Sequence, residues 1–420
     1  MSEPVIGGQE IDWSAAKRFT SNGALVKHRE CAQKWLYSTV RKFERLDYSE
    51  QVELGFGQWW HALRAASSID RGRALGSLQY APERLTTTDD GPTIDTVADG
   101  LVVSRVVLAA EQWWEKGIDE EQREIWTERL GEPMPQRLVN LFNRWSEHWS
   151  EELQQEKPLA VEMQWWRRLP RMTQPDGEKI DSNTALLGYV DEVYFDTKTS
   201  MVVVRDHKLH RRLDDKSHEA DLFNGQLQMY AFGIAPIVKD WGYGQVRAVS
   251  FDRAKMVAPK PPSLTKSGRL AQRGGEPSIS SSDLHTYLEW AKGPDGDGVP
   301  YPGMKKDGSD AGRYVAEESV IERLSTPQAR AAWFSRATQP ISRNVITAHL
   351  TAAVDSALDS ERTRARAEIT GAAARNFTKA CQWCDFAKLC RAEIVGGPAA
   401  TEDLELAEYG LKVKRKHPRS

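Results

Sequence analysis

The stretch from residue 186 to residue 208 constrains the fold most strongly, because charged residues interrupt two apolar runs within it. A short polar segment, residues 196–200, separates the two runs, and this pattern predicts a β-hairpin. Asp191 lies inside the first predicted strand, Asp206 ends the second, and Lys208 follows two residues later. Side chains two residues apart on a strand point to the same face, so we expect Asp206 and Lys208 to share one face of a sheet.

Asp191 and Asp206 need charge partners. A carboxylate within a buried strand costs free energy unless it is paired, and two carboxylates that approach each other repel unless a cation lies between them. One interpretation is that both carboxylates and the Lys208 ammonium converge where a divalent cation binds. The alternative is that Asp191 ends a strand or pairs with a surface Lys or Arg, and the hairpin alone does not separate the two interpretations.

The composition indicates a globular protein. With 420 residues and an apolar fraction of 40%, the chain suits one large domain with insertions, or two domains. No apolar run approaches the ~20 residues that span a bilayer, and the first residues are polar, so we expect a cytoplasmic protein without a membrane partner. The net charge of -3 does not indicate nucleic-acid binding. Basic residues cluster at 207–212 and near the C-terminus, where such a run is more often a solvated chain end.

Two segments before the hairpin contain further candidate residues. Residues 160–169 alternate between apolar and polar as a strand does, and they include Glu162 as a third acidic residue. A Gly-rich segment leads into a predicted helix that contains His61. A histidine beside Trp59 and Trp60 is more often packed in a core than a metal ligand, so His61 alone indicates little.

The segment after the hairpin predicts a helix and then a strand. Residues 221–234 place Gln226 and Tyr230 at positions i and i+4, on one helix face, although an ordinary helix face has the same pattern. A strand at residues 245–251 completes the sheet. Hairpin, helix and strand together predict an α/β fold.

The rest of the chain is expected to surround this core. Residues 70–100 are typical of a loop, residues 315–369 have a helical pattern broken by prolines, and residues 253–312 are typical of a flexible insertion with one short helix. No phosphate-binding GxxxxGK[ST] motif and no GxSxG motif is present. The expected organisation is 1–155, an N-terminal helical region; 156–252, the core; 253–312, the insertion; 313–395, a C-terminal helical region; and 396–420, a polar and basic tail.

The cysteines form one set of four. Cys381, Cys384 and Cys390 have the spacing C-x2-C-x5-C, and Cys31 lies about 350 positions earlier. In a cytosolic protein such a group favours metal ligation over disulfides. Zinc sites of four cysteines usually use two close pairs, whereas one remote cysteine with a triplet is typical of a 4Fe-4S cluster. The cluster is the favoured interpretation, and zinc or unligated thiols are the alternatives.

Taken together, these motifs resemble the RecB-type branch of the PD-(D/E)XK nucleases, and the order of the elements matches from Cys31 to Cys390. The cysteine pattern is similar to that of the iron-sulfur members, such as the AddB nuclease domain and the CRISPR-associated exonucleases. The resemblance implies a restriction-endonuclease-like core with a central mixed sheet flanked by helices, closed by the metal cluster. Where the family commonly has an aromatic or aliphatic residue between acid and lysine, this chain has His207. That position is expected to act through its backbone carbonyl, so its side chain can vary.

The resemblance also implies an activity, namely a metal-dependent DNA exonuclease of recombination, repair or phage DNA processing. It implies that Mg2+ or Mn2+ is the metal ion, and that DNA ends or single strands are the substrate, with a helicase or recombinase as a candidate partner protein. The alternatives are a non-catalytic iron-sulfur subunit that binds DNA and a zinc-stapled structural protein. The roles that it implies are Asp191, Asp206, His61 and the His207 carbonyl as metal ligands; Lys208 and Glu162 as further catalytic residues; and Gln226 and Tyr230 at the nucleotide beside the cut. Arg205, Arg211 and Arg212 flank the site, and we expect them to hold the DNA backbone.

Overall fold

The computed structural model describes most of the chain, in ranges separated by gaps. The described residues are 5–6, 9–10, 18–45, 51–87, 91–173, 177–213, 225–265, 269–273, 276–277, 279, 281–293, 296, 298–300, 313–395, 403–409 and 411–413. Most of the basic C-terminal run and part of the predicted insertion lie outside these ranges.

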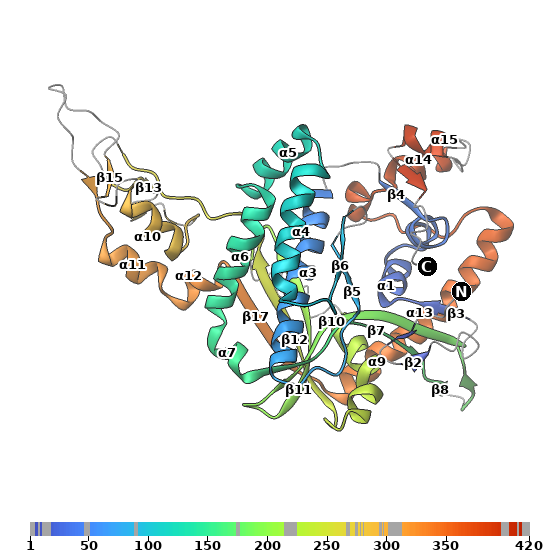
Figure 1. The fold of residues 1–420 in the computed structure, drawn as a ribbon. Coiled ribbons are helices and arrows are strands. Elements are labelled where there is room, and N and C mark those ends of the chain that lie inside the picture. Colours follow the sequence, from blue (N-terminus) through green and yellow to red (C-terminus); the bar gives the residue numbers. More distant parts are fainter. Residues whose placement is uncertain are drawn as a thin grey trace.

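A mixed sheet lies at the centre of the protein (Figure 1). Its described strands are β3 (Arg18–Thr20), β7 (Glu156–Arg168), β10 (Thr184–Asp196), β11 (Met201–His210), β12 (Val246–Lys255) and β17 (Phe334–Pro340). They run in the order β17-β12-β11-β10-β3, and β7 also pairs with β10. β11 pairs with β12 in parallel and β10 pairs with β3 in parallel, whereas the other pairs are antiparallel.

The predicted hairpin is confirmed as β10 and β11. Glu192 lies opposite Arg205, and the antiparallel pairing continues to Asp196 opposite Met201. The Asp196 carboxylate accepts a hydrogen bond of 2.9 Å from the N–H of Lys198, which closes the turn. The polar segment between the two runs therefore forms the turn that its residue types favour.

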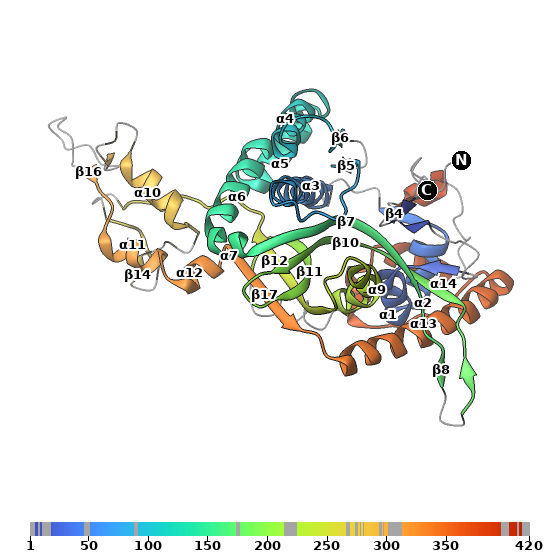
Figure 2. The ribbon, with the colours of Figure 1, turned by 60° about the horizontal axis from the view of Figure 1, so that its bottom comes forward.

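Helices cover both faces of the sheet (Figure 2). α3 (Gln51–Ala74), α4 (Val102–Lys116), α5 (Glu120–Leu130) and α6 (Met134–His148) enclose one apolar core. α1 (Asn22–Glu30), α9 (Gln226–Asp240) and α13 (Arg343–Thr370) enclose a second core on the other face. Within the described residues, no helix is long and apolar enough to cross a membrane.

Shorter elements complete the described parts of the chain. The helices are α2 (Ala32–Trp35), η1 (Leu36–Val40), α7 (Ser150–Gln155), α10 (Leu284–Lys292), α11 (Glu318–Leu324), α12 (Pro327–Ala331), η3 (Lys379–Trp383), α14 (Ala387–Ile394) and α15 (Asp403–Glu408). The strands are β1 (Val5–Ile6), β2 (Gln9–Glu10), β4 (Phe43–Arg45), β5 (Arg84–Thr86), β6 (Thr93–Asp95), β8 (Met172–Thr173), β9 (Lys179–Ile180), β13 (Gln272–Arg273), β14 (Glu276–Pro277), β15 (Val299–Pro300), β16 (Arg313–Tyr314) and β18 (Leu411–Val413).

Two glycines let α9 lie close to the sheet. A Cβ at Gly233 of α9 would lie 2.1 Å from the Trp165 ring, and a Cβ at Gly188 of β10 would lie 2.8 Å from it. Both distances are shorter than van der Waals contact, so the buried Trp165 ring fits only against residues without a side chain. This packing fixes α9 and the two residues Gln226 and Tyr230 at its start.

Two predictions of local structure are wrong. Residues 334–340 form β17 rather than helix, because they pair with β12, which lies about 90 positions earlier. β17 is an edge strand, where Pro340 is tolerated. Residues 70–100 are not all loop, because α3 continues to Ala74 and β5 pairs with β6.

The insertion contains the predicted short helix, α10, which begins after Asp283. The Asp283 carboxylate accepts a hydrogen bond of 2.8 Å from the N–H of Thr286, the arrangement of an N-cap. The described residues of this region share a buried cluster with the segment that follows it, and in this cluster the hydroxyls of Tyr287 and Tyr314 lie 2.8 Å apart. Figure 1 shows that α10 and α11 stand away from the central sheet.

Candidate active site

Three candidate residues from distant parts of the sequence meet beside the hairpin. His61 comes from α3, Glu162 from β7 and Asp191 from β10. One donor atom from each lies within 4.8 Å of the others, and His61 Nδ1 is 3.3 Å from Asp191 Oδ2. The side chain of His61 is 32% exposed and that of Glu162 is 28% exposed. His61 is therefore not packed into the core like its neighbours Trp59 and Trp60.

Glu162 has a backbone conformation that is unusual for a strand. Its φ of 47° lies in the left-handed region, which costs a residue with a side chain of order 1 kcal/mol or more. The strand changes face here, since Val161 packs in the core beneath α3 and Met163 in the core beneath α9. The pairing of β7 with β10 passes from Met163 opposite Val190 to Val161 opposite Glu192. Glu162 therefore lies opposite Asp191, and the local strain accompanies the approach of two carboxylates.

Asp206 and Lys208 share one face of β11, as predicted. Lys208 Nζ lies 2.7 Å from Asp206 Oδ2; the Asp206 side chain is buried, and that of Lys208 is 31% exposed. Asp191 Oδ2 accepts a hydrogen bond of 2.7 Å from the backbone N–H of His207. Because the pairing of β10 with β11 begins only at Glu192, Asp191 connects the two strands at the point where they diverge.

The carboxylates influence one another. Burial, Asp191 and Asp206 raise the pKa of Glu162 well above its ordinary value. Asp206 is thus close enough to repel Glu162, although it is not one of the three residues whose donor atoms converge. A cation between these groups would remove the repulsion, and carboxylate oxygens with one imidazole nitrogen are a donor set suited to Mg2+ or Mn2+. The residues of the site therefore fit a divalent ion.

The side chain of His207 points away from these carboxylates. Its ring nitrogens lie 3.7 Å from Asp252 Oδ2 and 3.7 Å from Glu192 Oε2, on the opposite face of β11. Burial and the Arg64 guanidinium lower the pKa of His207 to about 4, so the imidazole is neutral at pH 7. This side chain is therefore buried among charged residues, and the expectation that it can vary stays a prediction. The role of its carbonyl stays a prediction.

Gln226 and Tyr230 lie on the first turns of α9 and contact each other. The Gln226 amide donates a hydrogen bond to Tyr230 Oη, as the i, i+4 spacing allows. Burial and the charge of Asp206 raise the pKa of Tyr230, and Asp191 and Glu162 act in the same direction. The phenol is therefore protonated at neutral pH and lies within the field of all three carboxylates.

The prediction that Arg205 contacts a DNA backbone is wrong, because its side chain is 0% exposed and bonded to Glu156 and Glu192. Arg211 and Arg212 lie after β11, on the surface. Arg211 pairs with Glu53 of α3 at 3.3 Å, and both side chains are at least 42% exposed. Arg212 is exposed as well. Their contact with a DNA backbone stays a prediction.

The four cysteines come together although the sequence separates them. Cys31 precedes α2, Cys381 lies in η3, Cys384 follows η3, and Cys390 lies in α14. All four line one cavity of about 100 Å³. Burial raises the pKa of Cys384 and that of Cys390. The four cysteines therefore line one common cavity, and what they bind there stays a prediction.

Polar contacts join the same two segments. The Glu393 carboxylate accepts hydrogen bonds from Tyr37 at 2.5 Å and from Arg41 at 3.5 Å. The backbone N–H of Gln33 donates to the carbonyl of Ala374 at 2.9 Å. Hydrogen bonds therefore attach the N-terminal helices to the C-terminal segment.

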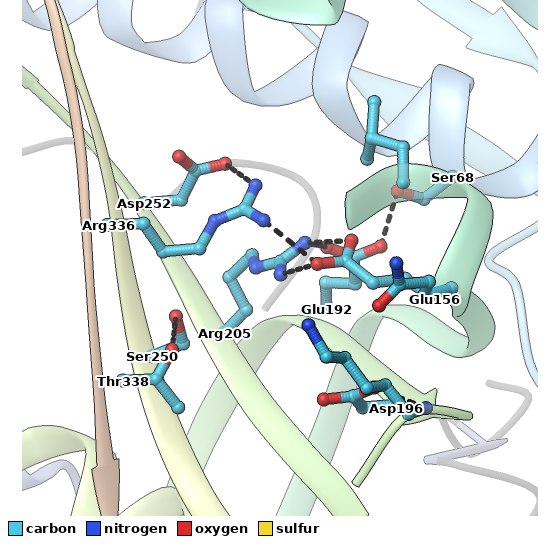
Figure 3. A network of polar contacts seen from close by, with 12 residues as sticks. Ser68, Glu156, Glu192, Asp196, Arg205, Ser250, Asp252, Arg336 and Thr338 are labelled. Atoms are coloured by element: carbon cyan, nitrogen blue, oxygen red, sulfur yellow. Dashed lines mark hydrogen bonds and ion pairs between the residues drawn. The ribbon is translucent and has the colours of Figure 1, made fainter. Parts of the chain in front are cut away.

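We did not predict a second group of charged residues, which lies on the other face of β11 (Figure 3). The sequence does contain a pattern that could have indicated this group. Glu192 follows Asp191 and Arg205 precedes Asp206, so each apolar strand carries two adjacent charged residues. The group consists of Arg64, Ser68, Glu156, Glu192, Arg205, His207, Asp252 and Arg336, all buried or nearly so.

Comparison with known proteins identifies one family. The sequence profile of the PD-(D/E)XK nuclease superfamily matches residues 20–391. No curated protein matches the chain. One similar solved structure is the crystal structure of a phage-related exonuclease from Haemophilus somnus 129PT, with 10% identity, coverage of 71% of this chain and 95% of that chain, and a TM-score of 0.20. A TM-score of 0.20 is too low to show a shared fold. The profile spans the sheet, the candidate metal ligands and the cysteines, and the chain belongs to the PD-(D/E)XK nuclease superfamily.

Proposed function

We propose that this protein is a divalent-metal-dependent deoxyribonuclease that hydrolyses phosphodiester bonds at DNA ends. The observation that carries the proposal is the convergence of His61, Glu162 and Asp191 within 4.8 Å, next to the Asp206–Lys208 pair. Membership of a nuclease superfamily supports the same chemistry.

The side chains have complementary roles in this proposal. Asp191, Asp206 and His61 would hold the ion, with the His207 carbonyl, and Glu162 adds a third carboxylate. A divalent ion bound there supplies a Lewis acid for the phosphate and lowers the pKa of a water molecule. Lys208 orients the attacking water and offsets the negative charge that develops on the phosphate.

Gln226 and Tyr230 are proposed to contact the nucleotide beside the cut. The protonated phenol of Tyr230 donates a hydrogen bond, and its ring offers a surface for a base. Such contacts suit an unpaired nucleotide at an end, because a paired base within a duplex does not expose its face. Arg211 and Arg212 would hold the phosphates of the adjoining strand.

A cleavage assay tests this function. End-labelled linear single-stranded and double-stranded DNA and a covalently closed circle are incubated with the protein and Mn2+, Mg2+ or a chelator. We expect the linear substrates to be degraded only with metal and the closed duplex to resist. Lys208→Ala should abolish cleavage while DNA binding persists, and Lys198→Ala, in the exposed turn of the same hairpin, is the matched control. Rapid cutting of closed circles would indicate an endonuclease, and metal binding without any cleavage would favour the non-catalytic subunit.

We further propose that Cys31, Cys381, Cys384 and Cys390 hold a 4Fe-4S cluster. The shared cavity supports this assignment, as does the spacing of the triplet. Bound to all four thiolates, a cluster would join segments about 350 positions apart and restrict the unfolded chain.

Anaerobic purification tests the cluster. The protein should be brown and contain about four irons per chain. Cys31→Ala should lose the colour as completely as Cys384→Ala, and both should have lowered thermal stability and weaker DNA binding. A colourless protein with one zinc would identify a structural zinc site instead, and a colourless, metal-free protein of unchanged stability would contradict any metal at these cysteines.

A further inference from the structure

A stripe of polar residues on α3 faces the sheet. His61, Arg64, Ser68 and Arg71 recur at intervals of three or four residues and therefore lie along one side of the helix. The first of them reaches Asp191 at the candidate active site. The other three contact groups behind the site, and Arg71 donates hydrogen bonds of 2.6 and 2.8 Å to the carbonyls of Leu153 and Glu156.

Arg64 and Ser68 connect α3 to the sheet through buried polar contacts. Arg64 Nη2 donates to Asp252 Oδ2 at 3.2 Å and lies 3.5 Å from His207 Nδ1. Its guanidinium also packs over the Trp145 ring, 3.0 Å from the centroid. The Ser68 hydroxyl donates to Glu192 Oε1 at 2.7 Å. Arg64 and Ser68 are 1% and 2% exposed, so solvent does not replace these contacts.

The partners of α3 belong to a continuous ion network, most of which is seen in Figure 3. Arg205 donates to Glu156 at 2.8 Å and to Glu192 at 3.1 Å. Arg336 donates to Glu156 at 2.9 Å and to Asp252 at 3.2 Å, and so connects β17 with β7 and β12. Including Arg64, three guanidinium groups face three carboxylates, and the His207 imidazole is neutral.

The network and the candidate active site use adjacent residues of the same strands. Arg205 and His207 alternate with Asp206 and Lys208 on β11, and Glu192 follows Asp191 on β10. Fixing one face of a strand also fixes the side chains on its other face, because the backbone is shared. The network therefore holds α3, β10 and β11 in one relative position behind the candidate metal ligands.

We propose that this buried network positions the metal ligands, and that Arg64 and Ser68 are positioning residues that set His61 of α3 against Asp191. The proposal rests on the proposed metal-dependent function. Groups behind a metal site that orient its ligands commonly alter metal affinity about tenfold or more when they are removed.

The test measures Mn2+ affinity in the absence of DNA, by titration calorimetry on the full chain. Ser68→Ala should weaken Mn2+ binding about tenfold, whereas Ser67→Ala, the neighbouring buried serine on α3, should bind as the wild type does. Arg64→Lys provides a second variant, since it keeps the charge opposite Asp252 but loses the planar fork. In cleavage assays at a fixed low Mn2+ concentration, Ser68→Ala should lower kcat and leave the KM for DNA unchanged.

The outcomes separate this proposal from the proposed function. Wild-type Mn2+ affinity in both Ser68→Ala and Arg64→Lys would overturn the positioning role, whatever the nuclease activity. Equal losses in Ser68→Ala and Ser67→Ala would also overturn it, because they would indicate a general loss of packing in α3. If the wild type binds Mn2+ but cuts no DNA, the nuclease function fails, and the affinities of the variants still decide the positioning role.

Discussion

β11 separates two clusters of charged side chains that differ in their balance of positive and negative charge. On one face, the carboxylates of Glu162, Asp191 and Asp206 share the Lys208 ammonium and the imidazole of His61. On the other face, three carboxylates meet three guanidinium groups at hydrogen-bonding distance. The first cluster has unbalanced negative charge in a partly exposed place, whereas in the second each carboxylate is paired with a guanidinium and the cluster is buried.

The pKa of a glutamate carboxyl group is therefore shifted in opposite directions on the two faces. Burial and neighbouring carboxylates raise the pKa of Glu162. Burial would also raise the pKa of Glu192, but Arg205 and other cationic groups outweigh it and lower the pKa to about 2. An unbalanced cluster attracts a cation, and a balanced one fixes the elements around it. The difference indicates which carboxylates bind a ligand and which hold the structure.

The largest expected effect is the loss of cleavage in Asp191→Asn. The amide keeps the shape and can still accept the hydrogen bond from His207, but it loses the charge that would hold a cation. We expect cleavage to fall about a thousandfold, with little change in the thermal midpoint. Cleavage rates and thermal unfolding of the metal-free protein measure this, and near-normal cleavage would contradict the assignment of Asp191.

Replacement of the adjacent residue, Glu192, should mainly lower stability, whereas replacement of Asp191 should mainly lower cleavage. Glu192→Gln removes one charge from a buried, balanced network, which should destabilise the protein by roughly 3 kcal/mol. Urea unfolding measures the loss, and Glu151→Gln on exposed α7 serves as a control within about 0.5 kcal/mol of the wild type. A Glu192→Gln protein as stable as this control would show that the network contributes no net stability.

The two clusters should respond oppositely to pH. The pKa of Glu192 is about 2 in the folded protein against an ordinary value of 4.5. Its contribution to the free energy of unfolding, roughly 3 kcal/mol, is therefore lost as pH falls below about 4.5 toward the folded pKa. The pKa of Glu162 is raised, so its contribution is present below its ordinary value of 4.5 and is lost as pH rises through the folded pKa.

Mn2+ should therefore restore stability on the alkaline side only, because it binds the deprotonated carboxylates. Unfolding curves from pH 3 to pH 8, with a chelator or with Mn2+, measure both effects. An equal gain from Mn2+ at every pH would contradict the assignment of the ion to this cluster.

The smallest expected effect is a gain of stability in Glu162→Gln. Removing one of the mutually repelling carboxylates should stabilise the metal-free protein by roughly 1 kcal/mol at pH 8 and weaken Mn2+ binding. Thermal unfolding with a chelator and calorimetric titration with Mn2+ measure the two changes. A destabilised metal-free variant would show that the Glu162 charge is compensated by groups other than a metal ion.

Local patterns in the sequence determined the hairpin, the strand that carries Glu162 and the helix that carries Gln226 and Tyr230. These features depend on periods of two residues in a strand and about four in a helix, which are properties of neighbouring residues. The shared face of Asp206 and Lys208 could be predicted for the same reason. The superfamily could be predicted as well, because the order of its short motifs is a property of the sequence.

Only the tertiary structure decided which side chains meet across elements. It brought His61 to Asp191, turned His207 toward Glu192 and Asp252, and made residues 334–340 a strand. It also placed Glu162 at a φ of 47°, which reverses the face of β7 at that residue. Each of these outcomes depends on contacts between segments far apart in the sequence. Such contacts set burial and charge pairing, and no local periodicity encodes them.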